Sequence, residues 1–194
     1  MATNKFQTIL KTLGMSSSKF KASAKKAVDW FETMAKLANS GKAKSAFSKS
    51  KGPVDSSSIG RLFLFSYDPK TKATLPFYDR MPLVFPIEFY ADGFLGINMH
   101  YLPPVLRARL MDALYDTINT DETPARLDIS YRILAGASRY EYFKPCVKRY
   151  LFSHMGSSMM PIDPQDWDIA MILPTERFAK ATNSQVWADS RGKV

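Results

Sequence analysis

Acidic side chains and one lysine late in the chain have the residue types and spacing closest to a catalytic set. They are Asp163, Asp166, Asp168, Glu176 and Lys180. Nucleases use spaced carboxylates and a lysine to hold a metal at the scissile phosphate. However, Asp163 and Asp166 lie in a proline-rich segment, where acids commonly cap turns. Glu176 and Lys180 have the spacing of an ordinary helix pair. We therefore expect no metal nuclease.

Histidine and cysteine offer no second catalytic set. His100 and His154 stand alone in the sequence, and Cys146 has no second cysteine for a CxxC pair or a disulfide. Metal sites need clusters of such residues at defined spacing. GxSxG, P-loop and GxGxxG motifs are also absent from the sequence. We predict packed or surface histidines, no metal, no cofactor and no enzymatic activity.

Positive charge is concentrated in the first third of the chain. The net charge is +9 and the pI is about 9.6. Residues 1–61 contain 12 Lys and Arg against 3 Asp and Glu, whereas residues 62–194 contain 15 of each. Such asymmetry is typical of a basic arm on a neutral domain that meets a polyanion. The sequence contains no run of 18 apolar residues, which is the length that would suggest a membrane span.

The arm, residues 1–59, is expected to contain two amphipathic helices. The first covers 4–13, and the second runs from the serines at 16–18 to Gly41. Its apolar side could dock on protein, whereas its lysines could touch phosphates; a membrane-surface helix is a third interpretation. The candidate docking residues are Phe20, Trp30, Phe31 and Met34, and the candidate phosphate contacts are Lys25 and Lys26.

Residues 39–58 are low in complexity and rich in Ser, Lys, Gly and Ala. Such a stretch buries too little apolar area to offset the entropy of ordering it. Two interpretations stay open: a solvated linker, and a strap that contacts phosphates through Lys42, Lys44, Lys49 and Lys51.

Residues 60–194 are predicted to form a compact α+β domain, with a small antiparallel sheet or barrel and a few helices. Pro86 implies an edge position or a bulge in its strand, and Ala91-Asp92-Gly93 is a hairpin signal. A helix should begin at Pro103-Pro104, and a short one should lie within 175–190. Strands are expected at 61–67, 83–90, 94–102, 126–134 and 167–173.

Residues 140–154 mix basic with aromatic residues, and the part at 146–154 could be helix or strand. Lys144, Lys148 and Arg149 are therefore candidate nucleic-acid contacts. Aromatic residues on strands can stack exposed bases, as in single-strand binders. The alternative, which composition favours, is that these rings form the hydrophobic core.

Several runs in the compact domain are similar to a known family. These are LFLFSYDPKTKATLPFYDRMPLVFPIEFYADGFLGINMHYLPP (62–104), FKPCVKRYLFSHM (143–155), DWDIAMILPTERF (166–178) and the ending VWADSRGKV. The pattern resembles the DNA end protector of T-even-like, contractile-tailed phages, over about residues 60–194 and without the arm. The resemblance implies a minor virion protein near the portal, present in the host cytoplasm during assembly. It would shield the terminal DNA from host exonuclease.

Two functions fit these observations. The first is a virion protein that binds double-stranded DNA ends by non-specific phosphate contacts and meets other virion proteins. The alternative is a connector in the neck, tail or baseplate, whose basic arm docks on protein subunits.

The charge division generates a first prediction. Deleting residues 1–58 should leave a soluble domain that unfolds cooperatively, because the predicted strands begin at Arg61. Thermal unfolding followed by circular dichroism measures this. A truncated protein without a cooperative transition would show that the arm belongs to the core.

Overall fold

The computed structural model describes residues 58–104, 106–107, 110, 141–162, 167–172 and 174–192. The arm to residue 57 and the predicted strand 126–134 lie outside these residues. So do the candidate contacts Lys25, Lys26, Lys42, Lys44, Lys49, Lys51, Phe20, Trp30, Phe31 and Met34.

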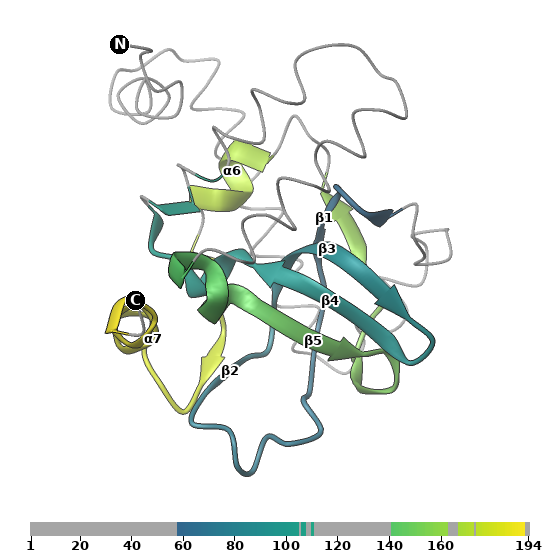
Figure 1. Ribbon diagram of the computed structural model, residues 1–194, viewed down its shortest axis with the longest axis horizontal. Coiled ribbons are helices and arrows are strands. Elements are labelled where there is room, and N and C mark those ends of the chain that lie inside the picture. Colours follow the sequence, from purple (N-terminus) through teal and green to yellow (C-terminus); the bar gives the residue numbers. More distant parts are fainter. Residues whose placement is uncertain are drawn as a thin grey trace.

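A five-stranded antiparallel sheet organises the described part of the chain, in the order β5-β4-β3-β1-β6 (Figure 1). A two-stranded ribbon pairs β2 with β7. The bounds are β1 Leu62–Leu64, β2 Tyr78–Asp79, β3 Leu83–Tyr90, β4 Gly93–Asn98, β5 Val147–Leu151, β6 Met160–Ile162 and β7 Phe178–Ala179. The sheet ends in β5 and β6, so among the described strands it is an open sheet, and the α+β prediction holds there.

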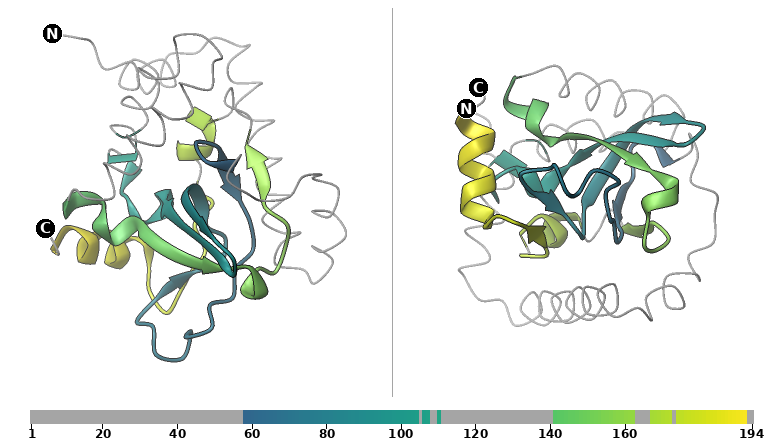
Figure 2. Two further views of the ribbon diagram at one scale, coloured as in Figure 1. Left: turned by 45° about the vertical axis from the view of Figure 1, so that its right-hand side comes forward. Right: turned by 90° about the horizontal axis from the view of Figure 1, so that it is seen from below.

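Short helices border the sheet. They are η2 Met99–Tyr101, η3 Glu141–Cys146, η4 Phe152–His154, α6 Trp167–Ile172 and α7 Asn183–Gly192. α7 lies beside η3 at one end of the sheet (Figures 1 and 2). It confirms the helix predicted within 175–190. The helix predicted at Pro103-Pro104 begins at Pro104, and Leu110 within it is buried.

Both faces of the sheet are buried, because alternate residues of its strands feed two apolar clusters. In β1, Leu62 and Leu64 enter the larger cluster, and Phe63 enters the smaller one. The smaller cluster is mostly aromatic: the Phe94 and Tyr150 rings stack with centroids 5.1 Å apart. The aromatic residues of the strands therefore serve mainly as core, as composition favoured.

Pro86 forms part of a β-bulge. The register between β3 and β4 shifts between Pro86 and Glu88. Proline has no N–H to donate to the ladder, so it is placed where the pairing is interrupted. The edge alternative was wrong for the strand as a whole, since β3 lies between β4 and β1. β1 pairs only with Leu83 and Val84, however, so Pro86 lies past its end.

The returning strand is shorter than predicted. β4 ends at Asn98, whose side-chain oxygen accepts a hydrogen bond from the His100 backbone N–H at 3.0 Å. This cap begins a 3₁₀ turn at residues that sequence reasoning assigned to the strand. His100 and Tyr101 therefore belong to a 3₁₀ turn and not to the hydrogen-bonded ladder of the sheet.

Residues 167–173 were predicted as a strand, and this was wrong: Trp167–Ile172 is the helix α6. The buried residues are Trp167, Ala170 and Met171, at helical spacings of three and four. A short apolar run fits either structure by composition alone. The Trp167 ring packs edge-on against Phe85, with centroids 5.1 Å apart.

Gly93 generates a second prediction. A Cβ at this position would lie 1.9 Å from the Tyr150 carbonyl oxygen, a backbone atom that cannot move without breaking the β4–β5 pairing. We expect Gly93→Ala to lower the free energy of unfolding by about 1–3 kcal/mol or more. The control is Ala91→Ser, at an exposed position of the same hairpin turn. Equal urea midpoints for the two variants would contradict the close approach.

Candidate nucleic-acid interface

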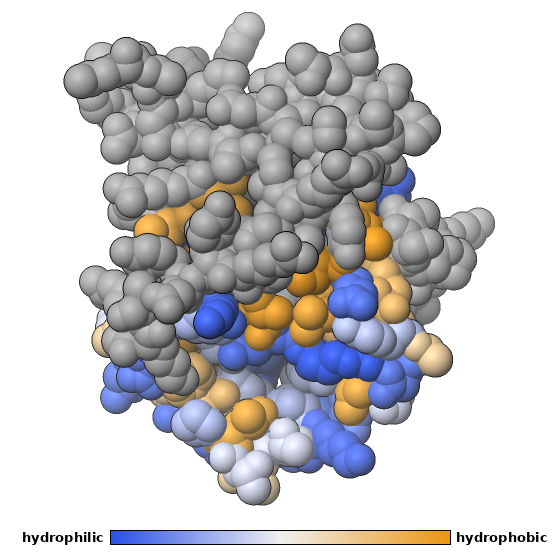
Figure 3. All heavy atoms as spheres, viewed as in Figure 1, coloured by the Kyte–Doolittle hydropathy of each residue, from blue (hydrophilic) through white to orange (hydrophobic). Residues whose placement is uncertain are grey.

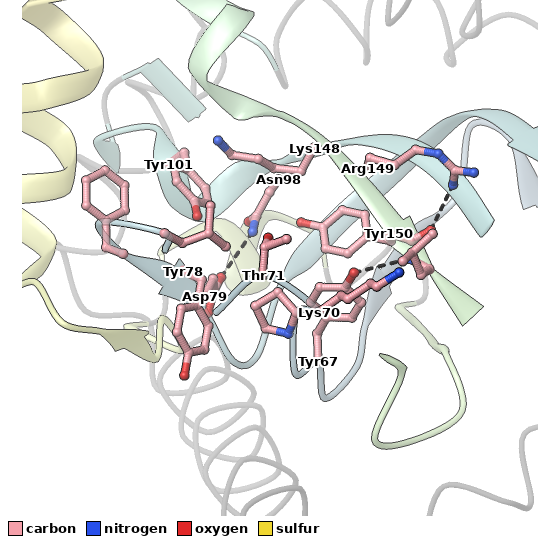
Figure 4. Close-up of a pocket in the computed structure, with 14 residues that line it drawn as sticks. Tyr67, Lys70, Thr71, Tyr78, Asp79, Asn98, Tyr101, Lys148, Arg149 and Tyr150 are labelled. Carbon is pink, nitrogen blue, oxygen red and sulfur yellow. Dashed lines mark hydrogen bonds between the residues drawn. The ribbon is translucent and has the colours of Figure 1, made fainter. Parts of the chain in front are cut away.

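A hollow of about 370 Å³ opens between β5 and the segment that joins β1 to β2. Lys70 and Thr71 line one side, and Lys148 and Arg149 of β5 line the other (Figure 4). The remaining lining residues are mostly aromatic or apolar: Tyr67, Pro69, Leu75, Phe77, Tyr78, Asp79, Asn98, Tyr101, Tyr150 and Leu151. Over this half of the molecule, hydrophilic and hydrophobic residues are interspersed (Figure 3).

Three tyrosine hydroxyls in the hollow have a pKa above the usual value. Burial raises the pKa of Tyr67, and the hydrogen bond from the Leu151 N–H opposes this. Burial likewise raises the pKa of Tyr101 and Tyr150, against hydrogen bonds from the Asp79 backbone and the Asn98 side chain respectively. The hydroxyl ends of Tyr101 and Tyr150 point toward Asn98 from opposite sides (Figure 4). All three phenols therefore stay protonated at neutral pH.

The cations of the rim differ in how they are held. Lys148 Nζ lies 4.3 Å from the centroid of the Tyr101 ring, a cation–π contact. Arg149 pairs with Asp92, and its guanidinium lies 4.4 Å from the Tyr90 ring. Lys70 is exposed and makes no ion pair with another described residue. Lys70 is thus the rim cation best placed to meet a phosphate, and Lys148 lies across the hollow from it.

Lys180 holds the wall of the hollow in place. Its Nζ donates to the carbonyl oxygens of Lys72, Ala73 and Leu75 at 2.6, 3.1 and 3.0 Å. Its backbone has φ 69°, a left-handed conformation that costs a non-glycine residue free energy. The three hydrogen bonds offset that cost and fix the turn that carries Thr71.

The floor of the hollow contains a buried carboxylate, that of Asp79. Oδ2 accepts from His100 Nδ1 at 2.6 Å and from Asn98 Nδ2 at 3.2 Å. Oδ1 accepts from the backbone N–H groups of Met81 and Arg177 at 3.0 and 3.3 Å. Four donors from separate segments thus converge on one side chain, which links the ribbon β2–β7 to the main sheet.

His100 extends this network, because its Nε2 lies 2.9 Å from the Thr175 hydroxyl. His100 stands alone in the sequence, but in the folded structure it is therefore not isolated. Asp79, His100 and Thr175 have the types of a nucleophilic triad. All are at most 5% exposed, so substrate has no access to the hydroxyl. In the described fold the set is a structural network.

The helix pair predicted for Glu176 and Lys180 near the C-terminus does not form. Glu176 is buried and pairs with Arg107, whose guanidinium also donates to the carbonyl oxygens of Leu102, His100 and Met171. Glu176 and Lys180 form no helix pair, because this segment is extended and enters β7. Asp163 and Asp166 lie outside the described residues. Within them, no group of three His, Cys, Asp or Glu could hold a metal.

Cys146 is buried, and burial raises its pKa to about 12 against the opposing charges of Lys148 and Arg107. The thiol is therefore protonated at neutral pH and is a packing residue.

Sequence reasoning found part of this site. It named Lys148 and Arg149, which both line the hollow, and Lys144, which is exposed on η3 outside it. It missed Lys70 and the tyrosines as a group. The residues Asp68-Pro69-Lys70-Thr71-Lys72 also predict a turn from the sequence, and the hydrogen bond from the Lys72 N–H to the Pro69 carbonyl at 3.1 Å confirms it. No local pattern indicates that this turn faces β5.

Asp79 generates the third prediction. Burial opposes its ionisation, but the pairing with His100 and the hydrogen bonds from His100, Met81 and Asn98 lower its pKa below the usual value. Asp79 thus stabilises the fold above about pH 4, and this contribution is lost as the pH falls through the folded-state pKa. Asp79→Asn should lower the free energy of unfolding at pH 7 by about 1–3 kcal/mol.

Urea unfolding between pH 3 and 7 measures this effect. The gap between wild type and Asp79→Asn should narrow toward pH 3, and a gap independent of pH would contradict the assignment. The control is Asp68→Asn, at an exposed carboxylate paired with Lys72. It should change stability by less than about 0.5 kcal/mol.

Comparison with known proteins places the chain in a family. No helix of the described residues is long and apolar enough to cross a membrane. No curated protein and no solved structure matches the chain. A family model, described as phage T4 terminal DNA protecting protein, matches residues 1–190. The expectation that the resemblance excludes the N-terminal arm was therefore wrong, because the match includes it. The chain belongs to the phage T4 terminal DNA protecting protein family.

Proposed function

We propose that this protein binds the ends of packaged phage DNA and shields them from exonuclease, as a minor virion protein near the portal and neck. The observation that carries the proposal is the match of the terminal DNA protecting family to arm and domain together. A protein that must hold DNA needs cations, and the arm, residues 1–59, supplies +8 of the net charge of +9.

The hollow supplies a second, structured contact surface. Lys70 and Lys148 lie on its opposite sides, and the segment carrying Lys70 is fixed by Lys180. Cations on rigid elements meet phosphates with less loss of conformational entropy than cations on a free chain. In this proposal the arm attracts DNA over a long range, and the cations of the domain fix where the DNA is bound.

Protection in this proposal comes from occupancy, without chemistry on the DNA. The described side chains that most resemble a catalytic set, Asp79, His100 and Thr175, are buried and engaged with one another. Glu176 is paired with Arg107. A bound protein that covers the last base pairs denies an exonuclease its entry point.

The fourth prediction tests the electrostatic part. Replacing Lys42, Lys44, Lys49 and Lys51 with Gln should weaken binding to duplex ends of any sequence. The slope of log affinity against log salt should become shallower by about 0.9 per lost phosphate contact. Fluorescence anisotropy with an end-labelled duplex, at several salt concentrations, measures both quantities. An exonuclease assay on the same duplex measures protection.

The matched control replaces the same four lysines with Arg, which keeps the charge and should keep the slope. A quadruple Gln variant with an unchanged slope would refute the contact of this segment with phosphates. If that variant binds DNA normally but fails to enter particles, the connector function is favoured instead.

A further inference from the structure

The hollow has the size and the surface of a nucleotide site. Small-molecule sites are concave, mostly apolar, and start at roughly 300 Å³. This one holds about 370 Å³, and its aromatic lining includes the partly exposed Phe77 and Tyr78 as well as the buried Tyr67, Tyr101 and Tyr150. Aromatic rings are sequence-tolerant platforms for single bases, because every base has a π-face.

The polar groups in the lining are arranged for a ligand rich in acceptors. The Tyr67 hydroxyl oxygen accepts from the Leu151 N–H at 3.1 Å, and Tyr101 and Tyr150 are hydrogen-bonded by Asp79 and Asn98. A phenol oxygen that accepts from the protein still carries its own proton for a ligand. Base carbonyls, ring nitrogens and phosphate oxygens are such acceptors.

The charged residues around the hollow determine how a ligand is oriented in it. Lys70 and Lys148 border the 370 Å³ hollow. A shallower hollow of about 210 Å³ adjoins it and shares Tyr101 and Lys148, but Asp189 lines that side. A phosphate avoids the carboxylate of Asp189 and is attracted to the side of Lys70. The backbone therefore passes over the Lys70 rim while the base points inward.

A base pair in a duplex cannot present one base to a concave hollow of about 370 Å³, so only an unpaired nucleotide enters. Extruding a base costs a few kcal/mol inside a duplex and least where the strand is already unpaired. Ends fray, whereas the interior does not. A pocket for one nucleotide thus distinguishes a DNA end from the rest of the genome without reading sequence.

We propose that the hollow between β5 and the 69–75 segment binds the terminal nucleotide of a DNA end, with its base beside Phe77 and Tyr78, the partly exposed aromatic residues of the lining, and its phosphate at Lys70 and Lys148. This inference rests on the proposed function and specifies how an end is recognised. The arm then contributes affinity for any DNA, and the hollow contributes the preference for ends.

The experiment, our fifth prediction, uses the full chain and a duplex with 2-aminopurine at either the terminal or an internal position. Terminal 2-aminopurine fluorescence should change on binding, and internal 2-aminopurine fluorescence should not. Thr71→Trp places a large ring in the hollow and should abolish the terminal signal. It should also weaken binding to an open end by roughly tenfold, the effect of losing one stacked base.

The matched control is Thr74→Trp, an exposed threonine of the same turn that does not line the hollow. It should keep the signal. Because a Trp side chain in the hollow could disturb folding, a second pair changes only charge at exposed residues: Lys70→Glu should weaken open-end binding, and Arg61→Glu should do so less. A hairpin-capped duplex without ends should bind all five proteins, wild type included, through the arm.

An unchanged terminal signal in Thr71→Trp would overturn the inference. So would wild-type protein that protects ends from exonuclease without any terminal signal, and in both cases the proposed function would stand. If wild-type protein neither binds DNA nor protects its ends, the proposed function fails and the inference with it. Loss of signal in Thr71→Trp alone, with normal binding to the capped duplex, supports the inference.

Discussion

The described fold depends on the hydrogen bonds that the buried carboxylate of Asp79 accepts. A buried charge is tolerated only where hydrogen bonds and an opposite partner replace its lost hydration. Here the donors come from β4, from η2, from the turn before β3 and from the segment before β7. Arg177 lies 98 residues from Asp79, and Asn98 and His100 lie 19 and 21 residues away, so one side chain links the ribbon, the sheet and the floor of the hollow. The site and the core share these hydrogen bonds.

Much of the sheet could be predicted because its local signals agree with its tertiary position. The turn at Ala91-Asp92 and the fully apolar strand β1, which is buried on both faces, both follow from residue type and spacing. The failures have a common physical cause: a short apolar segment takes the structure that its neighbours permit. Trp167–Ile172 is helical because it packs on Phe85, a contact 82 residues away in sequence. The early end of β4 depends on a single cap at Asn98.

The site was less predictable than the sheet, because its residues meet only after folding. Lys148 was visible as a cation among aromatics, yet nothing near it in sequence indicates Lys70. His100 was expected to stand alone, since its partners Asp79 and Thr175 lie 21 and 75 residues away. Charge asymmetry is a property of composition and could be interpreted directly. Pocket shape depends on long-range packing and could not.

The hydrogen bonds from Lys180 to the turn at 72–75 determine when, during synthesis, the hollow can be completed. The wall of the hollow is made from residues translated early, but it is secured by hydrogen bonds from a residue translated more than a hundred positions later. A nascent chain on the ribosome therefore exposes its basic arm long before its hollow is finished. Premature termination before residue 180 would yield a product that is attracted to nucleic acid but lacks a fixed wall. Under the proposed function, end recognition therefore requires the completed chain, because the basic arm is synthesised before the wall of the hollow is secured.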